Sequence, residues 1–465
     1  RAPGALWVVL VVPALLYSRW LTLQAGYATD PAARLTEQLA EPFTSSSVPT
    51  ATEGPLVLVV VDTLRWDHGI TMESYARLAA RGAHWERAMS TASWTIPAMG
   101  SVFTGELPGI HGAGSIPGSE DSFSALDPDI AYLPTELDAR GWSTAGFVAN
   151  PILSRALGFS SGFDTYSTPV DRPAHPLMLP GRLAQRGIYD GDWLVDHAID
   201  WVDDQPDHGW FLWLQLFEPH VPYEHAPSVG LPGIVDRDAL RAVPEDQRDA
   251  VRAAYAHEVQ VVDRQIGRLL DALEARGFFE TGTLILTADH GEELWDHGDA
   301  EHGHTHHGEV VDVPLVVVGP SIPPGARTTV ASLVDVHATL AARAGLPSSG
   351  LDLAHTIPAD RTAFAAGNVR ALDERSARAG ELRAIRTCDA GREVPRVFDL
   401  ALDPTEQRAL PASHAPALVD AAGQVRTAAE HLDAAALNTG RLEALGYVHG
   451  DTPLRSVCEA PEAPR

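Results

Sequence analysis

The chain has 465 residues, and 45% of them are hydrophobic, which provides enough apolar side chains for a large core and excludes a mostly disordered protein. Its 62 acidic residues outnumber 34 basic ones, and the net charge of −28 argues against nucleic acid as a partner. Every basic residue is arginine, because the sequence contains no lysine. Cys388 and Cys458 are the only cysteines, which excludes a disulfide scaffold and leaves open whether these two pair.

The N-terminus carries an uncharged apolar run, Gly4–Tyr17. The run is shorter than the roughly 20 residues that span a bilayer. It fits a signal segment or part of a membrane anchor, with a buried helix as the alternative. We therefore interpret residues 1–23 as an apolar signal or anchor segment and the polar, turn-rich residues 24–54 as a linker. This arrangement predicts membrane association through the N-terminus and a location outside the cytoplasm, in the periplasm or at the cell surface.

The middle of the chain alternates predicted strands with predicted helices. The continuous apolar run Leu56–Val61 is typical of a central parallel strand that is buried on both faces. A long helix is expected over Gln247–Arg276, because its apolar residues share one face and Gly277 follows as a stop. The other expected strands are Thr144–Ala149, Trp210–Leu216, Thr283–Thr287 and Pro314–Val318. The alternation predicts an α/β fold with a doubly wound, mostly parallel sheet flanked by helices.

The alternation of predicted strands and helices weakens near the C-terminus, where the chain becomes rich in alanine and arginine. We expect one strand there, Leu382–Thr387, and a final helix, Leu418–Leu445. The chain is accordingly divided into a catalytic domain over 55–345 and a smaller α+β subdomain over 346–465.

Acidic side chains follow two of the predicted strands, at the carboxyl ends where open α/β sheets bind ligands. Asp62 comes directly after Leu56–Val61, and Asp289 with His290 comes shortly after Thr283–Thr287. Either aspartate alone could simply cap the next helix. Together, two carboxylates and an imidazole predict a site for one divalent metal ion, without distinguishing Ca²⁺, Mn²⁺ and Zn²⁺.

A third feature is the segment Ser93–Ser101, which reads SWTIPAMGS. Pro97 is typical of a first helical turn and puts Thr95 at or near the N-cap. A hydroxyl at that place faces the positive end of the helix dipole, and a coordinated metal would turn it into a nucleophile. An ordinary threonine cap gives the same local pattern, so the interpretation depends on the other motifs.

In order and spacing these motifs resemble the sulfatase family of the alkaline-phosphatase superfamily, from about Pro55 to the C-terminus. The matching segments are Leu58–Trp66, Trp94–Gly112, Phe217–Tyr223, Val259–Gly267 with Leu270–Gly277, Asp289–Glu292, His302–His304 with Val313–Leu315, Val397–Leu400, Asp403–Glu406 and Leu442–Val448. The resemblance implies an alkaline-phosphatase-like fold and an enzyme that transfers or hydrolyses an ester group at a metal ion.

The resemblance also implies roles for individual residues. The implied metal ligands are Asp62, Thr95, Asp289 and His290. Thr95 is the implied nucleophile, and His220 would bond the transferring group or protonate the leaving oxygen. His304 would act from the opposite side, as an oxyanion donor or as a ligand of a second metal. Arg65 would supply positive charge that lysine supplies in other members.

The chain departs from the family pattern at the nucleophile. Sulfatases place a cysteine there, within Cys-x-Pro-x-Arg, and oxidise it to formylglycine, whereas this chain has Thr95 and Met99. A formylglycine hydrate expels sulfate by reverting to the aldehyde. A threonine ester has no such exit, so water or an acceptor must attack the bound group, and superfamily relatives with a threonine nucleophile act on phosphorus.

We therefore expect a phosphate- or phosphonate-type ester substrate, small or linked to a lipid or glycan. Whether the reaction is hydrolysis or transfer stays open. A sulfatase that works without formylglycine is the alternative, and a non-catalytic binding relative is a third interpretation.

The segment Asp296–His307 is rich in histidine. One interpretation is a second metal site. The interpretation that we favour is a solvated loop in which only His304 points inward. Glu292 and Glu293 are expected to be supporting or surface groups.

Overall fold

The computed structural model describes residues 54–115, 123–168, 191–226, 237–369, 373–389 and 392–425. The predicted N-terminal segment, all but the last residue of the predicted linker and the chain after residue 425 lie outside these ranges. Among the residues described, no helix is both long and apolar enough to cross a membrane.

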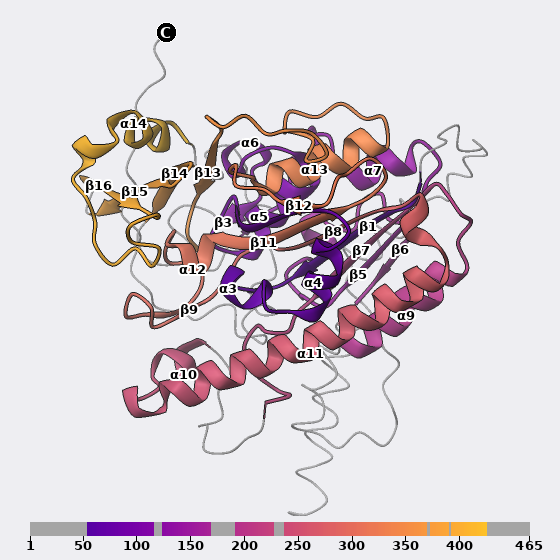
Figure 1. The fold of residues 1–465 in the computed structure, drawn as a ribbon, viewed down its shortest axis with the longest axis horizontal. Coiled ribbons are helices and arrows are strands. Elements are labelled where there is room, and N and C mark those ends of the chain that lie inside the picture. The colour runs from indigo at the N-terminus through magenta and orange to yellow at the C-terminus, as the bar shows by residue number, and fades with distance from the viewer. Residues whose placement is uncertain are drawn as a thin grey trace, which may run out of the picture.

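An eight-stranded sheet runs through the larger part of the molecule in the order β12-β2-β11-β8-β1-β7-β5-β6 (Figure 1). Its strands are β1 (Leu56–Val61), β2 (Ala83–Met89), β5 (Ser143–Val148), β6 (Thr165–Ser167), β7 (Trp210–Leu216), β8 (Thr283–Ala288), β11 (Asp312–Val318) and β12 (Gly325–Ala326). Only β11 is antiparallel to its neighbours in this sheet, which confirms the mostly parallel arrangement. Every residue of β1 is buried, as its continuous apolar run predicts.

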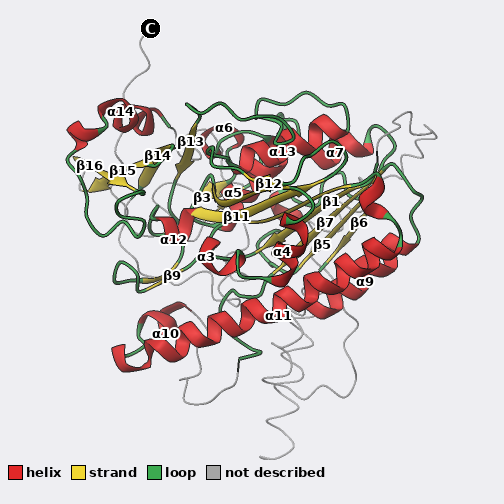
Figure 2. Cartoon of the chain, in the orientation of Figure 1, coloured by secondary structure: helices red, strands yellow, loops and turns green. Residues whose placement is uncertain are grey.

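Helices cover both faces of this sheet (Figure 2), as a doubly wound fold requires. One face carries α4 (Glu73–Ala79), α9 (Gly191–Asp203) and α11 (Arg248–Ala275), and the other carries α5 (Thr95–Thr104), α7 (Leu133–Asp138) and α13 (Leu333–Arg343). The predicted helix Gln247–Arg276 is confirmed as α11, with Gly277 in a left-handed conformation at φ 72° just beyond it. Shorter elements are α3 (Trp66–Gly69), α6 (Pro108–His111), α10 (Arg237–Arg241), α12 (Gly308–Val311), β3 (Gly114–Ser115), β4 (Phe123–Ser124), β9 (Glu293–Leu294) and β10 (Ala300–Glu301).

A second, antiparallel sheet forms the C-terminal part, with one helix packed on it. It consists of β13 (Thr362–Ala366), β14 (Glu374–Ala379), β15 (Leu382–Asp389), β16 (Arg392–Asp399) and the helix α14 (Pro416–Gln424). The strand expected over Leu382–Thr387 is confirmed as the first part of β15. The expected final helix, Leu418–Leu445, corresponds to α14 as far as Gln424, and Val425 is extended. The rest of the expected helix, residues 426–445, lies outside the described residues. Cys388 in β15 is disulfide-bonded, and Cys458 lies outside the described residues.

The carboxyl ends of neighbouring strands meet at one edge of the central sheet. Val61 of β1 is level with both Leu216 of β7 and Ala288 of β8. The residues that follow these strands therefore emerge side by side, and this edge receives Asp62 and Asp289.

Asp312, the first residue of β11, joins the two sheets through a buried ionic cluster. Its carboxylate accepts hydrogen bonds from Arg87 of β2 at 2.7 Å, from Arg378 of β14 at 3.2 Å, and from Arg383 of β15. Burial favours the protonated acid, but the charges of the three arginines outweigh it and hold the pKa of Asp312 well below its usual range. The carboxylate is therefore ionised and shared between the two sheets.

We expect the substitution Asp312→Asn to lower the free energy of unfolding by about 3 kcal/mol, because it leaves buried guanidinium groups without their counter-charge. Urea denaturation followed by circular dichroism measures this change. A matched control is Asp271→Asn, whose side chain is 72% exposed and pairs with Arg77, and which should cost less than about 1 kcal/mol. Equal losses for the two variants would contradict the assignment.

Candidate active site

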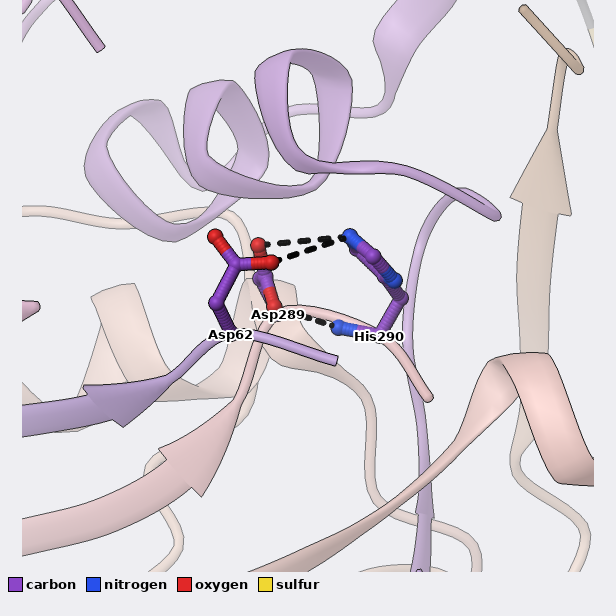
Figure 3. A group of neighbouring side chains, drawn as sticks. All are labelled: Asp62, Asp289 and His290. Atoms are coloured by element: carbon purple, nitrogen blue, oxygen red, sulfur yellow. Dashed lines mark hydrogen bonds and ion pairs between the residues drawn. The ribbon is translucent and has the colours of Figure 1, made fainter. Parts of the chain in front are cut away.

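Asp62, Asp289 and His290 converge beyond the carboxyl ends of β1 and β8 (Figure 3). One ligand atom of each lies within 4.8 Å of the others. The His290 Nε2 atom is 3.5 Å from Asp289 Oδ2 and 3.8 Å from Asp62 Oδ1. All three side chains are fully buried. The structure thus brings together the three residues that the strand ends predicted.

Each carboxylate in this cluster uses one oxygen for the protein and turns the other toward the shared space. Asp62 Oδ2 accepts a hydrogen bond from Asn150 Nδ2 at 2.5 Å. Asp289 Oδ1 accepts from the backbone N–H groups of His290 at 2.9 Å and Thr63 at 3.3 Å. Asp62 Oδ1 and Asp289 Oδ2 are buried and accept no hydrogen bond from the residues described. Two unpartnered carboxylate oxygens therefore remain in one buried space.

The third member, His290, presents a lone pair to these oxygens. Its Nδ1 lies 2.9 Å from the Gly291 carbonyl oxygen, so the ring proton is on Nδ1 and Nε2 is an acceptor. Burial lowers the pKa of His290 to about 4, so the ring is neutral near pH 7. A lone pair and two carboxylate oxygens repel one another, and a cation among them would turn this repulsion into coordination.

The donor set fits one divalent metal ion. Burial raises the pKa values of Asp62 and Asp289, and the neighbouring Asp289 charge raises that of Asp62 further. Burying two carboxylates together costs free energy, and a bound cation would remove that cost. Carboxylate oxygens with one imidazole suit Ca²⁺, Mn²⁺ and Zn²⁺. Within the described ranges, no other group of acidic, histidine or cysteine side chains has the geometry to hold a metal.

Thr95 completes the cluster from the helix above it. It is the first residue of α5, after the N-cap Trp94, and its side chain is buried. Thr95 Oγ1 is 3.2 Å from His290 Nε2 and 3.4 Å from Asn150 Nδ2. The hydroxyl therefore lies at the positive end of the α5 dipole, beside the unpartnered carboxylate oxygens.

The sequence model of the family described as Sulfatase matches residues 55–346, well over half of the chain. The chain belongs to the sulfatase family. Its fold is alkaline-phosphatase-like, as the motifs predicted. Sulfatases generally depend on a divalent metal, and the cluster of Asp62, Asp289 and His290 is a potential metal site.

Three relatives illustrate the range of the family. A choline-sulfatase of Rhizobium meliloti is 28% identical over 170 residues, 31% of this chain and 33% of the relative. A sulfatase of Formosa agariphila is 23% identical over 338 residues, 60% of this chain and 65% of the relative. The inner membrane protein YejM of Salmonella typhimurium is 25% identical over 297 residues, 62% of this chain and 41% of the relative. The chain thus spans less than two thirds of each relative's length.

Solved structures share the fold. A 2-O GAG sulfatase superposes with a TM-score of 0.63 at 16% identity, covering 79% of this chain and 90% of that structure. The phosphonate monoester hydrolase of Agrobacterium radiobacter superposes with a TM-score of 0.58 at 19% identity, covering 79% and 94%.

Two further histidine rings extend from the cluster. The ring centroids of His290 and His302 are 4.4 Å apart, and those of His302 and His220 are 5.1 Å apart. His304 Nε2 instead lies 2.8 Å from Glu293 Oε2. His302 thus packs beside both His290 and His220, whereas His304 contacts Glu293. Gly303, at φ 76°, turns the chain between them, and the motif alone could not tell which ring faces the metal site.

Much of the histidine-rich segment is buried, including His302, His306 and His307, although Asp296 and Gly298 are exposed. The expectation of a solvated loop with only His304 pointing inward is therefore wrong. Its imidazoles pair with glutamates: His297 with Glu309, His302 with Glu292, His304 with Glu293 and His307 with Glu406. Glu292 and Glu293 are themselves buried and are supporting groups rather than surface groups.

Arg65 does not point its charge at the metal cluster. Its guanidinium bonds both carboxylate oxygens of Asp67 and of Asp296, and it donates to the Glu292 carbonyl oxygen at 3.1 Å. Arg65 therefore ties the loop after β1 to the loop after β8, and the positive charge that the sequence analysis assigned to it is neutralised.

Asn150 is the site residue that the sequence analysis missed. It stands two residues after β5 and donates to both Asp62 and Thr95. The signal was the same as for the aspartates, a polar residue at the end of a buried strand. It was overlooked because an amide is not the usual choice for a metal ligand or a proton carrier.

We expect Asn150→Ala to weaken metal binding about tenfold, because supporting hydrogen bonds of this kind orient the ligands. Isothermal titration of the metal-free protein with Mn²⁺ measures the affinity. Asn368→Ala is a matched control, since this buried amide bonds Ser93 instead. If the two variants bind Mn²⁺ equally well, Asn150 does not support Asp62.

A pH dependence follows from His297. Burial lowers the pKa of its imidazole, but the hydrogen bond to Glu309 outweighs burial and raises that pKa to about 9. A raised histidine pKa gives stability that is complete below about pH 6.5 and is lost as the pH rises through about 9. The thermal unfolding midpoint should therefore decrease as the pH is raised from about 6.5 to about 9. The decrease should be smaller in His297→Gln. His355→Gln, whose side chain is 80% exposed, should keep the wild-type slope, and an unchanged slope in His297→Gln would contradict the assignment.

Proposed function

We propose that this chain is a metal-dependent member of the sulfatase family that hydrolyses or transfers a phosphate- or phosphonate-type ester through Thr95. The observation that carries the proposal is the position of Thr95 Oγ1, 3.2 Å from His290 Nε2 at the start of α5. A family sulfatase has a cysteine-derived formylglycine there. Cys388 and Cys458, the only cysteines of this chain, are far from Thr95 in sequence, so a nucleophile of that type has no precursor.

The metal would be held by Asp62, Asp289, His290 and Thr95. A bound divalent ion supplies charge neutralisation on a non-bridging oxygen of the ester and lowers the pKa of the coordinated hydroxyl. Asn150 orients Asp62 and Thr95 together through its amide. With its proton passed to solvent water and the resulting charge stabilised by the α5 dipole, Thr95 Oγ1 would attack the phosphorus in line as the bond from phosphorus to the leaving oxygen breaks.

Two histidines beyond the cluster serve the transferring group. His220 Nδ1 donates to the Val221 carbonyl oxygen at 2.5 Å, so Nε2 is the nitrogen that exchanges a proton with the leaving oxygen. His302 lies between His220 and His290, and Glu292 Oε1 fixes its ring at 3.0 Å. His302 thus takes the role of hydrogen-bond donor to the transferring group, and His304 supports it indirectly by packing the same loop against Glu293.

Phosphorus is favoured over sulfur by the chemistry of the intermediate. A threonine ester would be released only when water or an acceptor attacks the bound group and the bond to Thr95 Oγ1 breaks, and a phosphoryl group is open to such attack. The shared fold with a phosphonate monoester hydrolase is consistent with this choice. The match to a choline-sulfatase keeps sulfate esters as the second candidate. The substrate is a small molecule or an ester linked to a lipid or glycan.

The place of action is outside the cytoplasm. The apolar run within residues 1–23 supports export or anchoring. The similarity to an inner membrane protein supports the same location and an envelope substrate.

We expect Thr95→Ala to lower kcat at least about 1,000-fold on the best ester while metal binding persists, because Thr95 is the nucleophile and three other ligands remain. The assay measures turnover of four nitrophenyl substrates at a saturating concentration of the metal ion. These are the phosphate monoester, a phosphate diester, a phosphonate ester and the sulfate ester. The control is Thr104→Ala, at the other end of α5, where the hydroxyl donates only to the Gly100 carbonyl oxygen within the helix.

If the wild type prefers nitrophenyl sulfate, the proposal of phosphorus chemistry is wrong, and a sulfatase that works without formylglycine takes its place. High residual activity in Thr95→Ala would overturn the covalent route. Wild-type inactivity on all four esters would contradict hydrolysis and favour transfer to a dedicated acceptor or a binding role.

A further inference from the structure

One helix, α11, contacts the three loops that carry the site. These are the first metal loop, residues 62–65, the second metal loop, residues 289–296, and the His220 loop, residues 217–226. Figure 1 shows α11 running along the same face of the sheet as α4 and α9. Each contact is a hydrogen bond between an α11 side chain and a loop.

The first metal loop is held by Tyr255, whose side chain is fully buried. The Tyr255 hydroxyl donates to the Thr63 carbonyl oxygen at 2.8 Å and accepts from the Arg65 backbone N–H at 2.9 Å. Thr63, next to the metal ligand Asp62, has a left-handed backbone at φ 54°, which is costly for a β-branched residue. This conformation brings the Thr63 N–H to Asp289, and Tyr255 holds it from the other side.

The second metal loop is held one turn earlier on α11. Arg252 donates through Nε at 3.1 Å and through Nη2 at 2.8 Å to the Leu294 carbonyl oxygen. Leu294 follows the ligands Asp289 and His290 within this loop.

The His220 loop is held on both sides of His220. Gln265 Nε2 donates to Glu218 Oε1 at 3.2 Å. Glu258, which is 1% exposed, accepts hydrogen bonds from the backbone N–H groups of His225 at 2.6 Å and Ala226 at 2.9 Å. A second contact joins Glu258 to the His225 imidazole at 2.8 Å.

We propose that α11 sets the separation between the metal site and His220, with Tyr255 and Glu258 as positioning residues. Tyr255 and Glu258 are three residues apart on the helix, so they are neighbours on its surface. Tyr255 sets the place of Asp62, and Glu258 sets the place of His220. This inference rests on the metal site and the His220 role of the proposed function, and it predicts that the two tethers affect different measurable steps.

Tyr255→Phe removes only the hydroxyl and should weaken Mn²⁺ binding about tenfold, because the first metal loop loses its support. Excess Mn²⁺ should restore its kcat. Tyr75→Phe is the matched control, since this buried tyrosine donates to the Trp85 carbonyl oxygen away from the site. The control should bind Mn²⁺ as the wild type does.

Glu258→Gln should lower kcat about tenfold at saturating Mn²⁺, with Mn²⁺ affinity within twofold of the wild type. Glu258→Asp should recover part of the kcat. The control Asp335→Asn replaces a buried carboxylate that accepts hydrogen bonds from the backbone N–H groups of Ser332 and Leu351, outside the three site loops, and should leave kcat unchanged even if the thermal unfolding midpoint falls.

The inference is overturned if both tether variants lose Mn²⁺ affinity and kcat in proportion to their unfolding midpoints, as general loosening would produce. It is also overturned if Tyr255→Phe binds Mn²⁺ as tightly as Tyr75→Phe. Failure of the wild type to bind any of Mn²⁺, Ca²⁺ or Zn²⁺ is a different result, since it would remove the metal site of the proposed function itself.

Discussion

The structure depends on a buried electrostatic conflict that protein groups alone do not resolve. Asp62 and Asp289 each direct one unpartnered carboxylate oxygen into a space that the lone pair of His290 also faces. Such an arrangement persists only when neighbouring groups hold it and a cation compensates for it. In the proposed function, the same conflict would prepare the Thr95 hydroxyl for nucleophilic attack, since Thr95 shares the space in which that cation would lie.

The surrounding fold supplies the rigidity. The level ends of β1 and β8 place the two aspartates side by side. Arg65 uses its whole guanidinium to tie the loops after these strands together. The C-terminal sheet is joined to the central one through Asp312, so the segment that carries His302 is packed between two anchored layers.

Much of the architecture was readable from the chain. Strand β1 and helix α11 were predicted because each has an apolar pattern that is typical of its type. Strand β1 is a continuous apolar run, and α11 has apolar residues along one face over many turns. The metal cluster was predicted because the carboxyl ends of parallel strands share one edge of a sheet. Errors arose where a neighbour distant in sequence decides the outcome. The histidine-rich segment was expected to be solvated, yet Glu406 and other remote glutamates bury its rings.

The sequence by itself determined the family, the order of strands and helices, and the residue types available at each strand end, because local patterns and spacing encode these. The motif match likewise led to the proposal that Thr95 stands where sulfatases have a cysteine. Only the tertiary structure decided that His302 rather than His304 faces the metal cluster, that Asn150 supports Asp62, and that Tyr255 and Glu258 hold the loops. These outcomes depend on contacts between segments tens to hundreds of residues apart, and side-chain direction at a turn such as Gly303 is set by packing rather than by the motif.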